Sequence, residues 1–277
     1  MFDSPADVTS RLAAADYLSD DAIATSVYLA AALQKPLLVE GPAGVGKTQL
    51  AKAVAAATGS QLIRLQCYEG LDEARALYEW NYKKQLLRIQ ATSTDDDIFT
   101  QEFLLERPLL KAIRADEPTV LLIDEMDKAD VEVEGLLLEL LSDFQVTIPE
   151  LGTISAVRRP YVILTSNATR ELSEALKRRC LYLHIEYPTP ERERDIVLSQ
   201  VPTIRADLAE RLAATVATLR ALELKKAPSV AETVDWARTL LALGRDDLDE
   251  ETVATTLGVV LKHASDQVRA IKELGLA

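Results

Sequence analysis

The sequence predicts an α/β domain with three layers built on a parallel five-stranded sheet, followed by a smaller all-α domain. Two observations predict this fold class. Strand-like apolar runs alternate with helix-like segments up to residue 188, and helical patterns alone follow the two prolines at 188 and 190. Alternating strands and helices are typical of a parallel sheet between two helix layers. We therefore expect one domain over residues 1–188 and a helical domain over residues 189–277.

Five short apolar runs have the composition of strands. They are almost continuously hydrophobic, as expected for strands that are buried on both faces. In chain order they are residues 36–40 (PLLVE), 61–67 (QLIRLQC), 119–125 (TVLLIDE), 161–167 (YVILTSN) and 181–187 (LYLHIEY).

Helices are expected between these runs and after them. Residues 47–57 are rich in strong helix formers. In residues 131–144 the apolar side chains follow the helical spacing i, i+3, i+4, i+7. Three more apolar stripes with helical spacing predict the second domain: Leu208, Leu212, Val216 and Leu219; Val234, Ala237, Leu240 and Leu241; and Val253, Leu257, Val260 and Leu261.

Composition narrows the class of protein. The chain has 277 residues, 48% hydrophobic and 27% charged, which is in the globular range. Its formal net charge of -13 argues against broad binding of nucleic acid or anionic membranes. The amino-terminal MFDSPADV lacks the features of a signal peptide, and the run AIATSVYLAAAL is too short to span a bilayer. We expect a cytoplasmic protein without stable membrane insertion, whose Cys67 and Cys180 are buried, reduced thiols.

The segment GPAGVGKT, residues 41–48, follows a predicted strand and opens a predicted helix. It satisfies G-x-x-x-x-G-K-[ST] in the strand–loop–helix context that this pattern requires. Its glycines let consecutive backbone N–H groups surround phosphate oxygens, and the helix adds its positive dipole end. Lys47 is expected to reach the β and γ phosphates of ATP, and the Thr48 hydroxyl to bind Mg²⁺. The predicted nucleotide-binding residues are Gly41, Pro42, Ala43, Gly44, Val45, Gly46, Lys47, Thr48 and Gln49.

Polar residues end two later buried strands, residues 119–125 and 161–167. Asp124 and Glu125 lie at the carboxyl end of TVLLIDE, where ligands of open α/β sheets bind. Asp124 suits Mg²⁺, and Glu125 is placed to polarise a water for attack on the γ phosphate. Asn167 ends YVILTSN and is expected to hydrogen-bond that water or the γ phosphate. Because a phosphotransferase excludes water, the acidic pair favours hydrolysis.

These motifs resemble those of AAA+ ATPases. GPAGVGKT, LLIDE and TSN are followed by an arginine cluster and a helical lid, so the resemblance covers nearly the whole chain. Within the superfamily the chain looks like the MoxR branch. The similar blocks are KPLLVEGPAGVGKTQLAKAVA, QCYEGLDEARALYEW, VLLIDEMDKADVEVEGLLLELLSDFQVTIPELG and SEALKRRCLYLHIEYPTPERE. CYEGLDEARALYEW and FQVTIPELG particularly resemble members linked to maturation of molybdenum-containing carbon monoxide dehydrogenase-type enzymes.

The resemblance implies cofactors and partners. Members of the branch form rings, commonly hexamers, with ATP and Mg²⁺ at subunit interfaces. They remodel, mature or activate a protein client, often a metalloenzyme. Their partner is often a protein with a von Willebrand factor A domain, which would link the ring to its client. We therefore expect this chain to form a homo-oligomeric ring with such a partner and client.

Three consecutive cations, Lys177, Arg178 and Arg179, stand out in an acidic chain. The carbonyl dipole of a helix end accounts for one or two of them. The resemblance places the cluster at the subunit edge, where Arg178 or Arg179 would reach the ATP of the neighbouring subunit. The sequence does not separate these two candidates.

Two inserts also match the MoxR pattern. Residues 70–98 resemble an insert that faces the central pore, where Tyr78, Trp80 and Tyr82 either touch a client or pack locally. Within it, residues 92–97 (TSTDDD) are expected to form a solvated loop or a helix start. Residues 146–159 are expected to form a hairpin.

One position departs from the family pattern. Related lids carry an arginine at the start of their third helix, where this chain has Ala231. In related lids this arginine reaches back to the γ phosphate. Arg238 is two turns further along the helix, roughly 10 Å away, so we assign this contact to no residue.

Two other functions stay open: a nucleotide-dependent binding switch with little turnover, and a DNA-directed AAA+ ATPase. Glu125 and the arginine pair argue against the switch, and the acidic charge argues against DNA. A small-molecule kinase fits least well, because the helical lid and the acidic pair suit it poorly.

Overall fold

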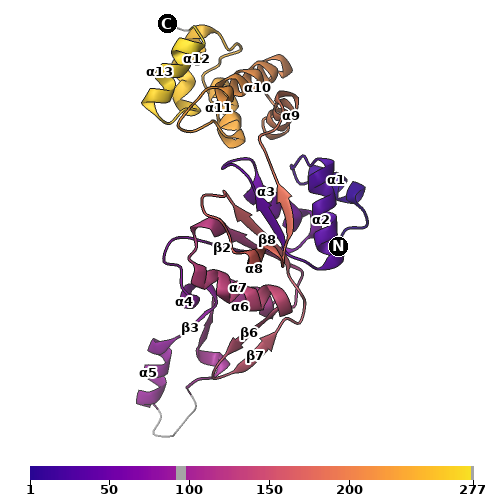
Figure 1. Ribbon diagram of the computed structural model, residues 1–277, viewed down its shortest axis with the longest axis vertical. Helices are drawn as coiled ribbons and strands as arrows, with labels where there is room; N and C mark the ends of the chain where they lie inside the picture. Colours follow the sequence, from indigo (N-terminus) through magenta and orange to yellow (C-terminus); the bar gives the residue numbers. More distant parts are fainter. Residues whose placement is uncertain (92–97, 276–277) are drawn as a thin grey trace. The chain divides into compact units, whose positions relative to one another are not determined.

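The computed structural model describes residues 1–91 and 98–275, and the expectation for residues 92–97 lies outside the described residues. The chain divides into two compact units (Figure 1). The first contains most of residues 1–184. The second contains residues 185–277 together with the short segments 16–18 and 42–46. Each unit is described by itself.

A parallel sheet of five strands forms the centre of the first unit. Its order is β2 (Gln61–Gln66), β5 (Thr119–Asp124), β8 (Tyr161–Ser166), β1 (Leu37–Glu40) and β9 (Leu181–His184). These are the five runs predicted to be strands, so the predicted fold class is confirmed. Strands β5 and β8 are neighbours, with Ile123 paired to Leu164. The residues that follow these two strands therefore emerge at the same edge of the sheet.

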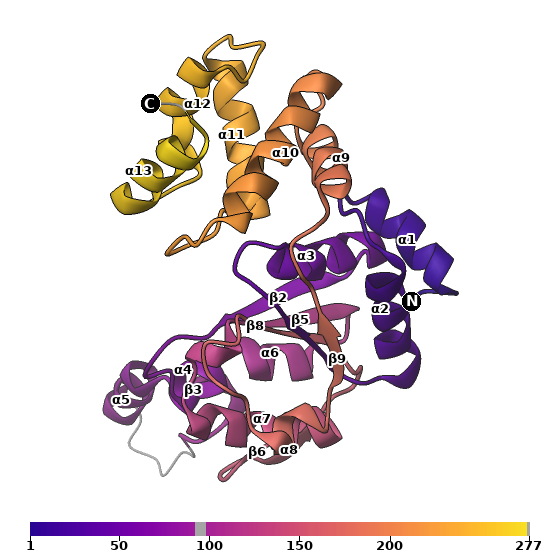
Figure 2. The same cartoon turned by 45° about the horizontal axis from the view of Figure 1, so that its top comes forward.

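Helices cover both faces of this sheet (Figure 2). Leu121 and Ile123 of β5 belong to a core cluster that includes the apolar side chains of α6 (Pro108–Arg114). Val120 and Leu122 are equally buried but lie outside that cluster, as alternation along a strand requires. Helix α3 (Lys47–Thr58) also packs on β5 and contributes none of its buried residues to that cluster. The first unit thus has the expected helix–sheet–helix layers.

The remaining elements of the first unit surround this core. They are α1 (Pro5–Ala13), α2 (Asp21–Leu33), α4 (Glu73–Ala76), β3 (Tyr78–Trp80), α5 (Tyr82–Ala91), η1 (Gln101–Phe103), β4 (Leu104–Glu106), η2 (Met126–Lys128), α7 (Val131–Asp143), β6 (Gln145–Ile148), β7 (Gly152–Ser155) and α8 (Glu174–Lys177). Strands β6 and β7 pair antiparallel, so the hairpin expected at 146–159 is present, beginning at Gln145.

The aromatic side chains of the insert have different surroundings. Strand β3 pairs antiparallel with β4. Trp80 is 7% exposed and packs edge-on against Tyr78 and Phe99, with ring centroids 6.2 Å and 5.3 Å apart. Tyr82, at the start of α5, is 62% exposed. Local packing therefore accounts for Trp80, whereas Tyr82 stays available for a contact.

Within the described residues, the segment 185–275 of the second unit contains helices joined by loops and no strand. Its elements are α9 (Pro190–Gln200), α10 (Ala206–Ala221), α11 (Val230–Ala242), α12 (Glu250–Thr256), η3 (Leu257–Val259) and α13 (Ala264–Glu273). The three predicted stripes pack into one core. The third stripe was expected on one helix, but α12 ends at Thr256 and a 3-10 turn follows. Threonines 255 and 256 and Gly258 have low helix propensity, which explains the break.

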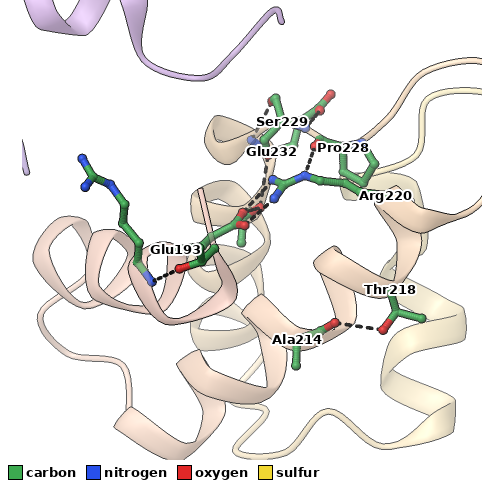
Figure 3. Close-up of polar contacts among 10 residues, drawn as sticks. Glu193, Ala214, Thr218, Arg220, Pro228, Ser229 and Glu232 are labelled. Carbon is green, nitrogen blue, oxygen red and sulfur yellow. Dashed lines mark hydrogen bonds and ion pairs between the residues drawn. The ribbon is translucent and has the colours of Figure 1, made fainter. Parts of the chain in front are cut away.

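A buried ion pair holds three of these helices together (Figure 3). Arg220 at the end of α10 donates two hydrogen bonds to the Glu193 carboxylate of α9, and its Nε donates to Pro228 O at 2.8 Å. Thr233 of α11 donates to Glu193 Oε1 at 2.6 Å. Arg238, the doubtful substitute for the lid arginine, pairs with Asp235 on its own helix at 3.4 Å.

The two cysteines are free thiols. Cys67 is buried, and burial, reinforced by the charge of Asp124, raises its pKa to about 12. Cys180 is half-buried, and burial likewise raises its pKa to about 12. Both thiols are therefore protonated and weakly nucleophilic near neutral pH.

Across the described residues, none of the helices combines the length and the apolar character needed to cross a membrane.

Candidate functional site

The phosphate-loop segment connects β1 to α3. Gly44 and Gly46 have φ values of 77° and 99°, in the left-handed region that side chains disfavour. Helix α3 begins at Lys47, directly after the loop in sequence, so its first backbone N–H groups have no acceptor within the helix. A glycine-rich loop followed directly by a helix start is a pattern that suits the binding of phosphate oxygens. The predicted nucleotide-binding role rests on sequence position alone, and stays a prediction, for Pro42, Ala43, Val45 and Gln49.

Lys47 joins the phosphate loop to the end of β8. Its side chain is buried, and Nζ donates to Gly41 O at 2.7 Å and to Asn167 Oδ1 at 2.8 Å. Burial lowers the pKa of Lys47, while the nearby carboxylates, Asp127 first, act in the opposite direction. The carboxylates around Lys47 thus favour its cationic form, which is the form that binds phosphate. Lys47 and Asn167, 120 residues apart, are thus brought together.

Thr48 and Asp124 also meet. Thr48 Oγ1 donates to Asp124 Oδ1 at 2.9 Å, and Thr165 Oγ1 donates to the same oxygen at 2.6 Å. A hydroxyl beside a carboxylate is a donor set that Mg²⁺ favours. Among the described residues, no group of three or more His, Cys, Asp or Glu side chains could hold a metal ion. The Thr48 hydroxyl and the Asp124 carboxylate fit a Mg²⁺ ion that phosphate oxygens would also hold.

Arg64 is a site residue that the sequence interpretation missed. It extends from β2, and its Nη2 contacts Asp124 Oδ2 in an ion pair. The signal for it was available: Arg64 and Gln66 are polar positions within the apolar run of β2. Strand β2 lies beside β5, with Gln66 opposite Asp124, so both side chains reach the acidic pair.

Glu125 has an unusual backbone conformation. Its φ is 58°, in a region that residues other than glycine seldom occupy and that is enriched at functional sites. Its N–H donates to Thr165 Oγ1 at 2.9 Å, and Gln66 Nε2 donates to its carboxylate at 3.1 Å. Glu125 is therefore held at both its backbone and its exposed side chain.

Asp127 is a second residue that the sequence interpretation missed. It is buried, and it accepts hydrogen bonds from the N–H groups of Asn167 at 3.1 Å and Thr169 at 3.3 Å. Burial alone would raise the pKa of Asp127, but hydrogen bonds from Thr169 and Asn167 hold it below its ordinary value. Asp127 therefore fixes the backbone of Asn167 beside Lys47.

The structure distinguishes the two candidate arginines. Arg178 is exposed, and within the described part of the chain its side chain makes no hydrogen bond or ion pair. Arg179 is half-buried, with Nε donating to Ser142 Oγ at 2.6 Å and Nη1 to Ala175 O at 2.8 Å. Lys177 pairs with Glu171 at 3.2 Å. Arg179 is thus the arginine whose position is fixed.

Curated proteins resemble this chain in sequence. The chain resembles an uncharacterized protein of Staphylococcus haemolyticus, with 27% identity over 66% of this chain and 67% of the relative. It also resembles one of Staphylococcus aureus, with 29% identity over 61% of this chain and 62% of the relative.

Among solved structures, a mutant of Thermotoga maritima RuvB matches 99% of this chain and 78% of its own chain, with a TM-score of 0.54 and 17% identity. Another Thermotoga maritima RuvB mutant matches 92% of this chain and 69% of its own chain, with a TM-score of 0.52 and 18% identity. At this level of sequence identity, the two matches show a shared fold and nothing about function.

A family pattern described as AAA domain (dynein-related subfamily) matches residues 36–180. The match runs from β1 through the arginine cluster and includes every candidate site residue discussed above. It covers more than half of the chain. This protein therefore belongs to the dynein-related subfamily of AAA domains, within the AAA+ ATPases.

Proposed function

We propose that this chain is a Mg²⁺-dependent ATPase whose site is made by Lys47, Thr48, Asp124, Glu125 and Asn167. The observation that carries the proposal is the convergence of these residues, from α3 and the ends of β5 and β8, at one edge of the sheet. Residues 41–49 would hold the phosphates, with Lys47 on the β and γ groups. Thr48 and Asp124 would hold Mg²⁺, which neutralises phosphate charge when it is bound.

Glu125 would orient the water that attacks the γ phosphate. Its fixed backbone and its position one residue after Asp124 support this role. Asn167, anchored by Asp127, would contact the γ phosphate or that water. Hydrolysis, rather than a switch with little turnover, is favoured because a carboxylate stands beside the metal-binding aspartate with its side chain exposed.

The arginines would act on the neighbouring subunit in a ring, for which six copies is the expected number. A cation that is already positioned stabilises transition-state charge without reorganisation. That consideration favours Arg179, whose guanidinium is held by Ser142, over the exposed Arg178. A trans arginine raises hydrolysis by on the order of 10³-fold or more. Residues 1–188 would form the nucleotide-binding domain and residues 189–277 its lid.

The finer role that we propose is that of a MoxR-type remodeller. Hydrolysis would drive movement against a protein client through a partner with a von Willebrand factor A domain. The resemblance to MoxR members makes a metalloenzyme the expected client. The blocks shared with MoxR members support this role. A molybdenum-containing dehydrogenase is the client class that these blocks favour.

Affinity capture of the Glu125→Gln protein with ATP tests the remodelling role. Slow hydrolysis should trap partner and client on the ring, so both should be recovered with ATP and lost with ADP. Lys47→Ala, which should not bind ATP productively, is the matched control. Recovery of the ring alone would count against remodelling. Salt-sensitive DNA binding at physiological ionic strength would instead favour a DNA-directed function.

A further inference from the structure

The segment of residues 167–173 connects the ATP site to the arginine cluster, and we call it the connecting loop. It begins at Asn167, whose side chain contacts Lys47, and it ends at Ser173, the residue that caps α8. Its start is fixed by Asp127, which accepts hydrogen bonds from Asn167 N and from the N–H and hydroxyl of Thr169. This much belongs to the site already described.

The end of the connecting loop is fixed by a different residue, Glu134 of α7. Its carboxylate is 2% exposed, with Oε2 accepting from Ser173 N at 2.9 Å and Oε1 lying 2.7 Å from Arg170 Nη1. Arg170 Nη2 also donates to Ala129 O at 2.8 Å. A buried carboxylate with two such partners is costly to displace, because loss of either partner leaves charge unpaired in the core. Glu134 therefore sets where α8 begins.

A second residue of α7 contacts the arginine itself. Ser142, eight positions after Glu134, accepts from Arg179 Nε at 2.6 Å and donates to Leu138 O at 2.6 Å. The apolar residues Leu172 and Leu176 pack in the same core as Leu137 and Leu140 of α7. Helix α7 thus holds the start of α8, its buried face and the guanidinium that follows it.

We propose that Glu134 and Ser142 are positioning residues that place Arg179 for the site of the neighbouring subunit. The inference rests on the proposed trans role of the arginines. Both residues act through Arg179: Glu134 accepts a hydrogen bond from Ser173 and forms an ion pair with Arg170, and Ser142 accepts one from the guanidinium. A displacement of about 1 Å in a catalytic group costs up to about 100-fold in rate. Substitution should therefore lower the rate in trans and leave ATP binding intact.

Mixed-subunit complementation separates this role from a merely structural one. Glu134→Gln and Ser142→Ala are each prepared, with Glu132→Ala as an exposed control on the same helix. Alone, each test variant should have a kcat lowered about 10-fold or more, with ATP affinity within about twofold of wild type. Glu132→Ala should match wild type.

Each test variant is then mixed with one of two reference subunits. Lys47→Ala has an impaired nucleotide site and an intact arginine, whereas the double variant Arg178→Ala/Arg179→Ala has the reverse. Mixing with Lys47→Ala should raise activity, because some interfaces pair an intact site with a correctly placed arginine. Mixing with the double arginine variant should give no rise. A misfolded variant would be complemented by neither subunit.

The reference subunits also distinguish the two levels of the proposal. If Lys47→Ala mixed with the double arginine variant gains no activity, the trans arrangement fails and the inference fails with it. If that mixture gains activity, the trans arrangement stands and the test variants decide the inference. The inference alone is overturned if the Glu134 and Ser142 variants complement the double arginine variant, or if they fail to complement Lys47→Ala. Should Glu134→Gln unfold, Ser142→Ala decides, because removing one exposed hydroxyl leaves the core unchanged.

Discussion

Replacing Arg64 with alanine should destabilise the ligand-free protein and at the same time strengthen its response to Mg²⁺. The Arg64 guanidinium pairs with Asp124, the carboxylate proposed to hold the metal. Removing one partner of a fully buried pair costs about 3–5 kcal/mol, whereas an exposed pair contributes about 0–1 kcal/mol. The Asp124 side chain is 2% exposed and that of Arg64 46%, so we expect a cost of about 2 kcal/mol, between these limits.

Two assays measure the two effects. Thermal unfolding without nucleotide should shift down by about 4–8 °C, from about 2–4 °C per kcal/mol in a chain of this size. In a Mg²⁺ titration of ATP hydrolysis, the half-saturating concentration should fall by up to about 25-fold, because a competing cation has been removed. Arg75→Ala, which removes an exposed arginine of α4, should change neither quantity. An unchanged or raised half-saturating concentration would refute the competition between Arg64 and the metal.

Three further predictions concern Thr165, Asp127 and the aromatic residues Trp80 and Tyr82. Thr165→Val should lower ATP turnover about 10-fold or more, since Glu125 N loses its acceptor; steady-state kinetics with retained ATP binding would check it. Asp127→Asn should lower the free energy of unfolding by a constant amount above pH 5. Because the folded-state pKa of Asp127 is below its ordinary value of 3.8, the difference between the two proteins should shrink as the pH falls through that folded-state pKa. Urea unfolding at several pH values measures this difference. Trp80→Ala should cost about 3–5 kcal/mol in urea unfolding and Tyr82→Ala under about 0.5 kcal/mol, because only the first is buried.

Each of these has a contrary outcome. Normal turnover in Thr165→Val would mean that the Glu125 backbone needs no anchor. A stability difference for Asp127→Asn that grows on acidification would reverse the sign of the pKa shift. Equal costs for the two aromatic substitutions would contradict their different burial.

The sequence predicted the sheet well because strands buried on both faces leave continuous apolar runs, and the polar residues after them mark one edge. Asp124 and Asn167 were predicted in this way, and Lys47 was predicted from the phosphate-loop motif; the structure brings these three side chains close to Thr48 and Asp127. Arg64 and Asp127 were missed for a physical reason. The role of Arg64 depends on the pairing of β2 with β5, and that of Asp127 on the pairing of β5 with β8. Strand pairing of this kind is set by tertiary packing rather than by a local pattern.

Buried acidic residues on helices are harder still to predict. Glu134 lies among the polar positions of an amphipathic helix, where a carboxylate is usually solvated. Its burial results from Arg170 and Ser173, nearly 40 residues away in sequence. The end of α12 was missed for a simpler reason, since apolar spacing continued across residues of low helix propensity.

Hydrolysis of ATP at this site is tested most directly by comparing wild type with Glu125→Gln at saturating ATP and Mg²⁺. ATP binding is measured in parallel for both proteins. Wild type should turn over ATP, and Glu125→Gln should bind it with similar affinity while its turnover falls by about 100-fold or more, since general-base catalysis contributes about 10²–10⁴-fold. Equal turnover in the two proteins would contradict the role of Glu125 and the site built around it.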